Sequence, residues 1–233
     1  MAGTEAAHTT IVFALYPGVT HLDFTGPHQV FTRLPGAEVI AASAAGGEIE
    51  ADGLVFGRLL RLADIARCDV LCVPGGYGCI AAMQDEGFMR EIRRLAAGAR
   101  YITSVCTGSL ILGAAGLLRG KRATTHWAWR DLLTPFGAIV TDGRVVRDGN
   151  VFTGGGVTAG IDFALTLAAE MIGDEGAQAI QLTLEYAPAP PFNSGHPGVA
   201  PGAIVERVSR MMNSRAAERR EGVERAAAAL AEA

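Results

Sequence analysis

Short apolar runs rich in β-branched residues alternate with helical patterns along most of this chain, and this alternation restricts its fold more than any other feature. Strands are expected at residues 10–15, 37–42 and 69–73 and in the run just before Cys106, and helices at residues 22–34, 85–97 and 158–172. Strands separated by helices pair in parallel, because each helix returns the chain across one face of the sheet. The sequence therefore predicts an α/β sandwich with a mostly parallel central sheet and helices on both faces.

Two segments are expected to leave this alternation as hairpins. The first is a polar excursion at residues 46–56. The second is centred on Asp148-Gly149-Asn150, which separates short strands at 145–147 and 151–153. An Asp-Gly pair between apolar runs is a strong signal for a tight hairpin turn.

The C-terminal part of the chain has a different character. A second helix is expected at 175–186, and residues 187–202 are rich in Pro and Gly, which predicts an irregular arm over the surface. In residues 203–233, Ala, Arg and Glu recur at helical spacing, which is typical of a long exposed helix. With no internal repeat or long linker, we expect one domain over residues 1–233.

Composition excludes several classes of function. With 49% hydrophobic and 19% charged residues, the chain is globular rather than disordered. Its net charge is −4, and no dense basic cluster precedes the last helix, so nucleic-acid binding is not expected. The most apolar helical segment, 158–172, contains Asp162 and Glu170 and is too short to span a bilayer.

The first ten residues and the cysteines bear on location and metal binding. Residues 1–10 lack a cationic start followed by an apolar core, so no signal peptide is expected and the protein is predicted to be cytoplasmic. Four cysteines in such a chain indicate reduced thiols rather than a disulfide framework. A zinc site would need a second paired set of ligands, so no metal is expected.

Cys106 lies where a β-branched run gives way to a small-residue helix start. Gly108 permits a sharp turn, and Gly116 closes the following helix. A cysteine that caps a helix at its positive end is stabilised as thiolate by the backbone N–H groups. Nucleophile elbows in hydrolases have the same strand, turn and helix. A buried structural cysteine is the alternative, and the local pattern leaves both open.

Asp23 follows the first predicted strand with apolar neighbours on both sides in sequence. Desolvation of a carboxyl favours its neutral form, which suits a proton donor that can also act as a base. The alternative is an Asp that caps the start of a helix, and the two roles are compatible.

Glycine-rich connectors at the carboxyl ends of strands are where open α/β sheets bind ligands. Three occur here, at residues 75–78, 106–108 and 154–158. The chain has neither a dinucleotide fingerprint after its first strand nor a phosphate loop, so these glycines do not indicate a nucleotide site. Backbone N–H groups from Gly76 or Tyr77 and from Thr107 are instead expected to converge near the Cys106 sulfur and stabilise negative charge.

Six motifs occur in order between Asp23 and Asn193: L-D-F-T-G-P, P-G-G-Y-G, S-V-C-T-G-S-L-I-L-G-A-A-G-L-L, R-A-T-T-H-W, T-G-G-G-V-T-A-G-I-D and L-E-Y-A-P-A-P-P-F-N. Together they resemble the DJ-1/PfpI superfamily and, within it, the isocyanide hydratases. The resemblance implies a flavodoxin-like sandwich, a homodimer and a cysteine at a strained elbow. It also implies hydration of an isocyanide to an N-substituted formamide without metal or organic cofactor, with Cys106, Asp23 and Thr107 as catalytic residues.

Departures from other branches of the superfamily narrow this expectation. Peptidase-like members have His directly after the cysteine, where this chain has Thr107, so proteolysis is not expected. Many relatives have Glu at the position of Asp23, and isocyanide hydratases resemble this chain in having Asp. Related glutamine amidotransferases need a His-x-Glu pair downstream of the cysteine. Neither His126 nor His196 has Glu two residues later, so an amidase triad is not expected.

The implied reaction fits these residue types. An isocyanide carbon takes up both a nucleophile and a proton, so Cys106 thiolate is expected to attack while protonated Asp23 supplies the proton. Water activated by the Asp23 carboxylate then releases the formamide, with the Thr107 hydroxyl orienting the carboxyl or the water. The substrate pocket is expected to include His126, Trp127, Gly155 and Val157, with Trp129 as further apolar wall.

Two other functions remain open. The Cys-Thr-Gly and Ala-Thr-Thr-His-Trp runs are similar to the cysteine-elbow domain of some AraC-like regulators, which would make the chain a ligand-sensing module. Residues 203–233 are, however, too few for a helix-turn-helix domain. The other possibility is a redox or carbonyl-stress protein similar to DJ-1, in which the cysteine is oxidised or attacks aldehydes.

Overall fold

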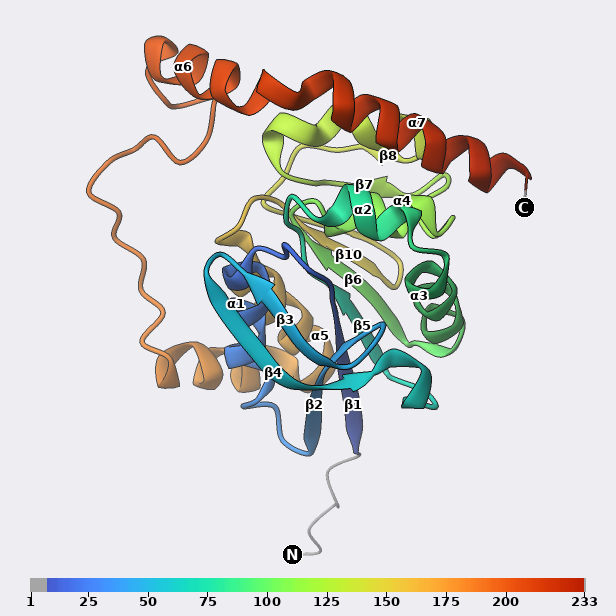
Figure 1. Cartoon of the computed structure of the whole chain (residues 1–233). Coiled ribbons are helices and arrows are strands. Elements are labelled where there is room, and N and C mark those ends of the chain that lie inside the picture. Colours follow the sequence, from blue (N-terminus) through green and yellow to red (C-terminus); the bar gives the residue numbers. More distant parts are fainter. Residues whose placement is uncertain (1–7, 233) are drawn as a thin grey trace, which may run out of the picture.

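The computed structural model, which describes residues 8–232, is built around one eight-stranded sheet (Figure 1). Its strands are β1 (Thr9–Leu15), β2 (Ala37–Ser43), β3 (Gly47–Ala51), β4 (Leu54–Arg61), β5 (Val70–Val73), β6 (Tyr101–Val105), β9 (Val145–Asp148) and β10 (Val151–Gly154). They lie in the order β3-β4-β2-β1-β5-β6-β10-β9. A separate pair consists of β7 (Arg122–Ala123) and β8 (Ile139–Val140).

The centre of the sheet is parallel and its margins are antiparallel. Strand β1 pairs in parallel with β2 and β5, and β6 pairs in parallel with β5 and β10. The expected hairpins are β3–β4 and β9–β10, both antiparallel. Every residue of β5 and β6 is buried, as the apolar run of β5 requires, and β6 buries Thr103 and Ser104 together with its apolar residues. The predicted α/β fold with a mostly parallel sheet is confirmed.

Helices cover both faces of the sheet. They are α1 (His21–Phe31), α2 (Cys79–Gln84), α3 (Glu86–Gly98), α4 (Gly108–Ala114), α5 (Ala159–Thr183), α6 (Gly202–Met212) and α7 (Ala216–Glu232), with 3-10 helices η1 (Leu62–Asp64), η2 (Trp127–Phe136) and η3 (Asn213–Arg215). Helices α1 and α5 pack against each other, whereas α2, α4 and α7 form a second group with η2 (Figure 1). Helix α5 contains both helices expected around residue 173, where Gly173 has φ 82° and interrupts the helical geometry.

The C-terminal extension differs from the single exposed helix that its composition predicted. Residues 187–201 form the irregular arm, after which α6 and α7 follow as separate helices joined by η3. Helix α7 buries Val223 and Arg219 against the body of the fold. Small residues permit this approach, because a Cβ on Gly222 would lie 2.5 Å from Ile80 Cγ2. The Arg219 guanidinium also stacks 4.4 Å above the Trp129 ring.

No signal peptide was expected in residues 1–10, and most of this segment, residues 1–7, lies outside the described residues. Within residues 8–232, no helix combines the length and apolarity that crossing a bilayer demands.

Candidate active site

Cys106 forms the turn between β6 and α4. Its φ is 54°, a left-handed conformation that costs a non-glycine residue about 1–3 kcal/mol. Surrounding hydrogen bonds hold it there: its N–H donates to Gly155 O at 2.8 Å, and its carbonyl accepts from Thr125 Oγ1 at 2.8 Å. The cysteine itself therefore makes the sharp turn. Gly108, expected at the turn, is needed for another reason, since a Cβ there would lie 2.0 Å from Val73 O.

Asp23 projects from the first turn of α1 and is fully buried. Its Oδ2 accepts a hydrogen bond from Gly75 N–H at 3.0 Å, a partner outside the helix. The helix-capping alternative is therefore wrong, and Thr20 occupies the N-cap position. The carboxyl also lies close enough to the Cys106 thiol for each group to affect the pKa of the other, and within residues 8–232 its Oδ1 has no hydrogen-bond partner.

The acid and the thiol share a dry environment. Burial raises the pKa of Asp23 to about 7, although hydrogen bonds from Gly75 and Cys106 act in the opposite direction. Burial and the nearby Asp23 charge raise the pKa of the Cys106 thiol well above its usual value, against the lowering effect of the Thr107 N–H. Thr107, not Cys106, is the N-cap of α4, and its amide does not outweigh burial. The expected free thiolate is therefore not favoured, and the pair keeps at least one proton at neutral pH.

Gly75 brings the loop after β5 between the acid and the thiol. A Cβ at this residue would lie 2.5 Å from Thr107 N, 2.7 Å from Asp23 Oδ2 and 2.8 Å from Cys106 Cβ. Only glycine fits this approach. This role was not predicted, although a Gly-Gly pair one residue after a buried strand was the available signal.

The Thr107 hydroxyl is held by the backbone of the same loop. Its Oγ1 accepts from Gly76 N–H at 2.8 Å and donates to Gly76 O at 3.1 Å. It therefore does not orient the Asp23 carboxyl, one of the two arrangements that we expected. The Gly76 amide is therefore already hydrogen-bonded. Tyr77 and Thr107 remain as the predicted amide donors to negative charge near the Cys106 sulfur.

A cavity of about 100 Å³ opens above Cys106. Its wall includes the predicted residues Tyr77, His126 and Val157, together with Trp129 from η2 and Met212 from the end of α6. The Met212 contact was not predicted, because no motif links the C-terminal extension to the cysteine more than a hundred residues earlier.

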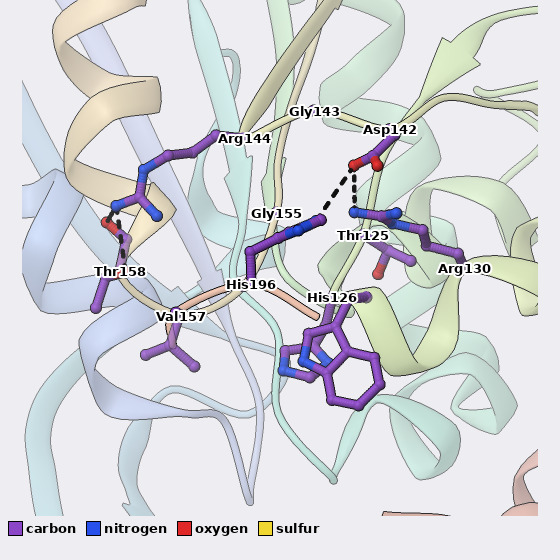
Figure 2. Close-up of a pocket in the computed structure, with 13 residues that line it drawn as sticks. Thr125, His126, Arg130, Asp142, Gly143, Arg144, Gly155, Val157, Thr158 and His196 are labelled. Atoms are coloured by element: carbon purple, nitrogen blue, oxygen red, sulfur yellow. Dashed lines mark hydrogen bonds and ion pairs between the residues drawn. The ribbon is translucent and has the colours of Figure 1, made fainter. Parts of the chain in front are cut away.

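The other two predicted pocket residues, Trp127 and Gly155, line an adjoining cavity of about 460 Å³. Figure 2 shows this cavity with Gly155 labelled. The two cavities share His126 and Val157. Within the described part of the chain, no group of three or more His, Cys, Asp or Glu side chains is placed to hold a metal ion.

Comparison with known proteins assigns the family. The DJ-1/PfpI family model matches residues 9–170. The chain belongs to the DJ-1/PfpI family. Among its DJ-1/PfpI relatives, the isonitrile hydratase of Pseudomonas putida is 53% identical over 94% of this chain and 97% of its own length.

A solved structure and a longer relative extend the comparison. The crystal structure of a THiJ/PfpI family protein from Pseudomonas syringae has a TM-score of 0.89 and 40% identity, covering 96% of this chain and 92% of that protein. The HTH-type transcriptional regulator CdhR of Pseudomonas aeruginosa is 31% identical over 75% of this chain, which spans 53% of the regulator. The DJ-1/PfpI fold therefore occurs both in an enzyme similar to this chain and within a longer regulator.

Proposed function

We propose that this protein is an isocyanide hydratase that adds water to an isocyanide and releases an N-substituted formamide. The observation that carries the proposal is the pairing of a buried Asp23 carboxyl with the Cys106 thiol, which affect each other's pKa and of which Cys106 lines the cavity. The 53% identity with an isonitrile hydratase over almost the whole of both chains supports the same reaction.

The first step uses the single proton that the pair shares. In the starting state Cys106 is a thiol and Asp23 a carboxylate whose pKa lies at about 7. The carboxylate accepts the thiol proton as the sulfur attacks the terminal carbon of the isocyanide. Asp23 then delivers this proton to the same carbon, which leaves a neutral thioimidate, R–N=CH–S–Cys106. One S–C and one C–H bond form, and no other reactant is needed.

The second step returns the pair to its starting state. The Asp23 carboxylate takes a proton from water as the oxygen adds to the thioimidate carbon, and Asp23 passes this proton to the nitrogen. The tetrahedral intermediate then gives its hydroxyl proton to Asp23 as the C–S bond breaks and the formamide forms, and Asp23 returns that proton to the sulfur, which restores the thiol and the carboxylate. The amides of Thr107 and Tyr77 are the proposed donors to negative charge at the sulfur, and the Thr107 hydroxyl holds their loop through Gly76.

A homodimer is proposed from the family resemblance, and the C-terminal extension supports it. Helix α6 buries none of its residues in the single chain, and Figure 1 shows it with the arm standing away from the sheet. Met211 and Phe192 on these segments are 67% and 77% exposed. We propose one domain over residues 1–233, because α7 packs on the body of the fold. A cytoplasmic location is also proposed, and the four free cysteines are consistent with a reducing compartment.

The ligand-sensing alternative has one specific observation in its favour, the similarity to a regulator of which this chain spans about half. The DJ-1-like stress function would use the same cysteine on aldehydes. Wild-type turnover separates these functions. The protein should convert p-nitrophenyl isocyanide to the formamide, followed by absorbance, and should leave glyoxal unconsumed. Glyoxal consumption without formamide formation would favour the stress function, and binding without turnover would favour a sensor.

A further inference from the structure

The cavity beside the catalytic pocket has the size and polarity of a ligand site. Its volume of about 460 Å³ lies in the range of about 300–1,000 Å³ that is usual for small-molecule pockets, whereas the Cys106 cavity of about 100 Å³ lies below it. The smaller cavity has room for an isocyano group and little more. Because the two share His126 and Val157, the larger one is the adjoining space for the rest of a substrate.

Two arginines line the larger cavity, and they differ in the donors that they leave free. Arg144 uses its guanidinium on Asp162, on Thr158 O and on Thr158 Oγ1. Within residues 8–232, Arg130 makes one ion pair, from Nη2 to Asp142 Oδ1 at 2.5 Å (Figure 2). Its Nε is buried without a hydrogen-bond partner in this part of the chain, and the side chain is 23% exposed, so a ligand in the cavity meets the Nη groups.

A guanidinium whose Nη groups carry more N–H donors than its one ion pair uses binds an anionic oxygen more strongly than a neutral acceptor. Asp142, the one carboxylate that lines the cavity, is 64% exposed and already bound by Arg130, with His196 Nε2 3.7 Å away. The lining therefore offers a donor to a ligand acceptor and no free carboxylate to a ligand cation.

His126 adds a second donor at the junction of the two cavities. Its Nδ1 accepts from Ala128 N–H at 3.3 Å, so the proton of the neutral ring sits on Nε2. Burial and the charges of Arg130 and Arg219 lower its pKa, which keeps the ring neutral. A neutral ring is a donor through Nε2 without adding charge next to the thiol.

We propose that this cavity binds the substituent of the isocyanide and that Arg130 makes the enzyme selective for substituents that carry a carboxylate. The proposal rests on the proposed hydratase function and specifies its substrate class. Arg130 is a specificity residue, because it contacts the substituent and not the reacting carbon.

The test compares 4-isocyanobenzoate with 4-methylphenyl isocyanide and 4-(aminomethyl)phenyl isocyanide, three substrates that share one ring. The wild type should have a kcat/KM for the carboxylate about tenfold or more above that for the methyl compound, as expected of a charge-assisted hydrogen bond. Arg130→Met should remove this ratio, and Arg130→Lys, which keeps the charge but lacks the planar Nη donors of the guanidinium, should restore only part of it. Arg122→Met, which removes an exposed arginine outside both cavities, should keep the ratio of the wild type.

A wild-type preference for the methyl or the aminomethyl compound would overturn the proposal, and so would an Arg130→Met enzyme with an unchanged ratio. Calorimetry provides a readout that does not depend on turnover or on the stability of the variant. Wild-type protein should bind the product analogue 4-formamidobenzoate more tightly than 4-methylformanilide. Equal binding overturns the subsite. If no isocyanide is hydrated while 4-formamidobenzoate still binds through Arg130, the hydratase function fails and the carboxylate subsite stands.

Discussion

Replacing Asp23 with asparagine measures the cost of burying its carboxylate. The folded protein raises the pKa of Asp23 from 3.8 to about 7, mainly by desolvation. A carboxyl with a higher pKa in the folded than in the unfolded state contributes stability that is fully present below the unfolded-state pKa. That stability is lost as the pH rises through the folded-state pKa. Asparagine has nearly the same shape, can accept from Gly75 N–H through its amide oxygen, and does not ionise.

The magnitude follows from the two pKa values. Between about pH 4 and pH 7, each pH unit lowers the stability of the wild type by about 1.4 kcal/mol relative to Asp23→Asn, and the loss then levels off. From pH 5 to pH 8 the free energy of unfolding of Asp23→Asn should therefore rise by about 3 kcal/mol relative to that of the wild type. Its activity should be lost at every pH, because the amide cannot transfer the proton.

Urea unfolding of both proteins at pH 5, 6, 7 and 8, at one protein concentration, provides the measurement. Asp131→Asn is the matched control, because it makes the same substitution at an aspartate that is 76% exposed on η2 and so removes no buried carboxylate. Parallel pH dependences for wild type and Asp23→Asn would refute the reasoning, since they would mean that the folded protein does not raise the pKa of Asp23.

Two further predictions concern catalysis. Gly75→Ala should lower kcat by about 100-fold or more, because a Cβ there displaces the acid, the thiol or the Thr107 amide. Gly98→Ala is the control, because a Cβ there meets nothing within 4 Å and kcat should be unchanged. Equal kcat values for the two variants would contradict the packing argument. For the wild type, kcat/KM should fall about tenfold per pH unit below about pH 7, because protonation of Asp23 removes the base that accepts the thiol proton. A kcat/KM that stays constant from pH 5 to pH 8 would argue against this role of Asp23.

The features that the sequence predicted well are those set by local pattern. Apolar runs located the buried strands, and the small residues after β6 placed the sharp turn at Cys106. Apolar neighbours predicted the raised pKa of Asp23. Local pattern could not predict the balance of forces on the Cys106 thiol, because burial and a carboxylate from another element outweigh the Thr107 amide.

Contacts between distant segments were beyond sequence reasoning. The fit of Gly75 between acid and thiol depends on how β5, β6 and α1 converge. Met212 reaches the catalytic cavity only because the arm carries the chain back across the fold, and the same arm brings His196 beside Asp142. Neither the length of an irregular arm nor its composition specifies where it returns.

The central claim is that the Cys106 sulfur forms a bond to the isocyanide carbon, and formamide formation by two cysteine variants tests it most directly. Cys106→Ala should lose turnover by a factor on the order of 10⁴ or more. Cys79→Ala, which removes another buried thiol close to the Thr107 side chain, should keep most of it. Substantial formamide production by Cys106→Ala would contradict covalent catalysis at this cysteine.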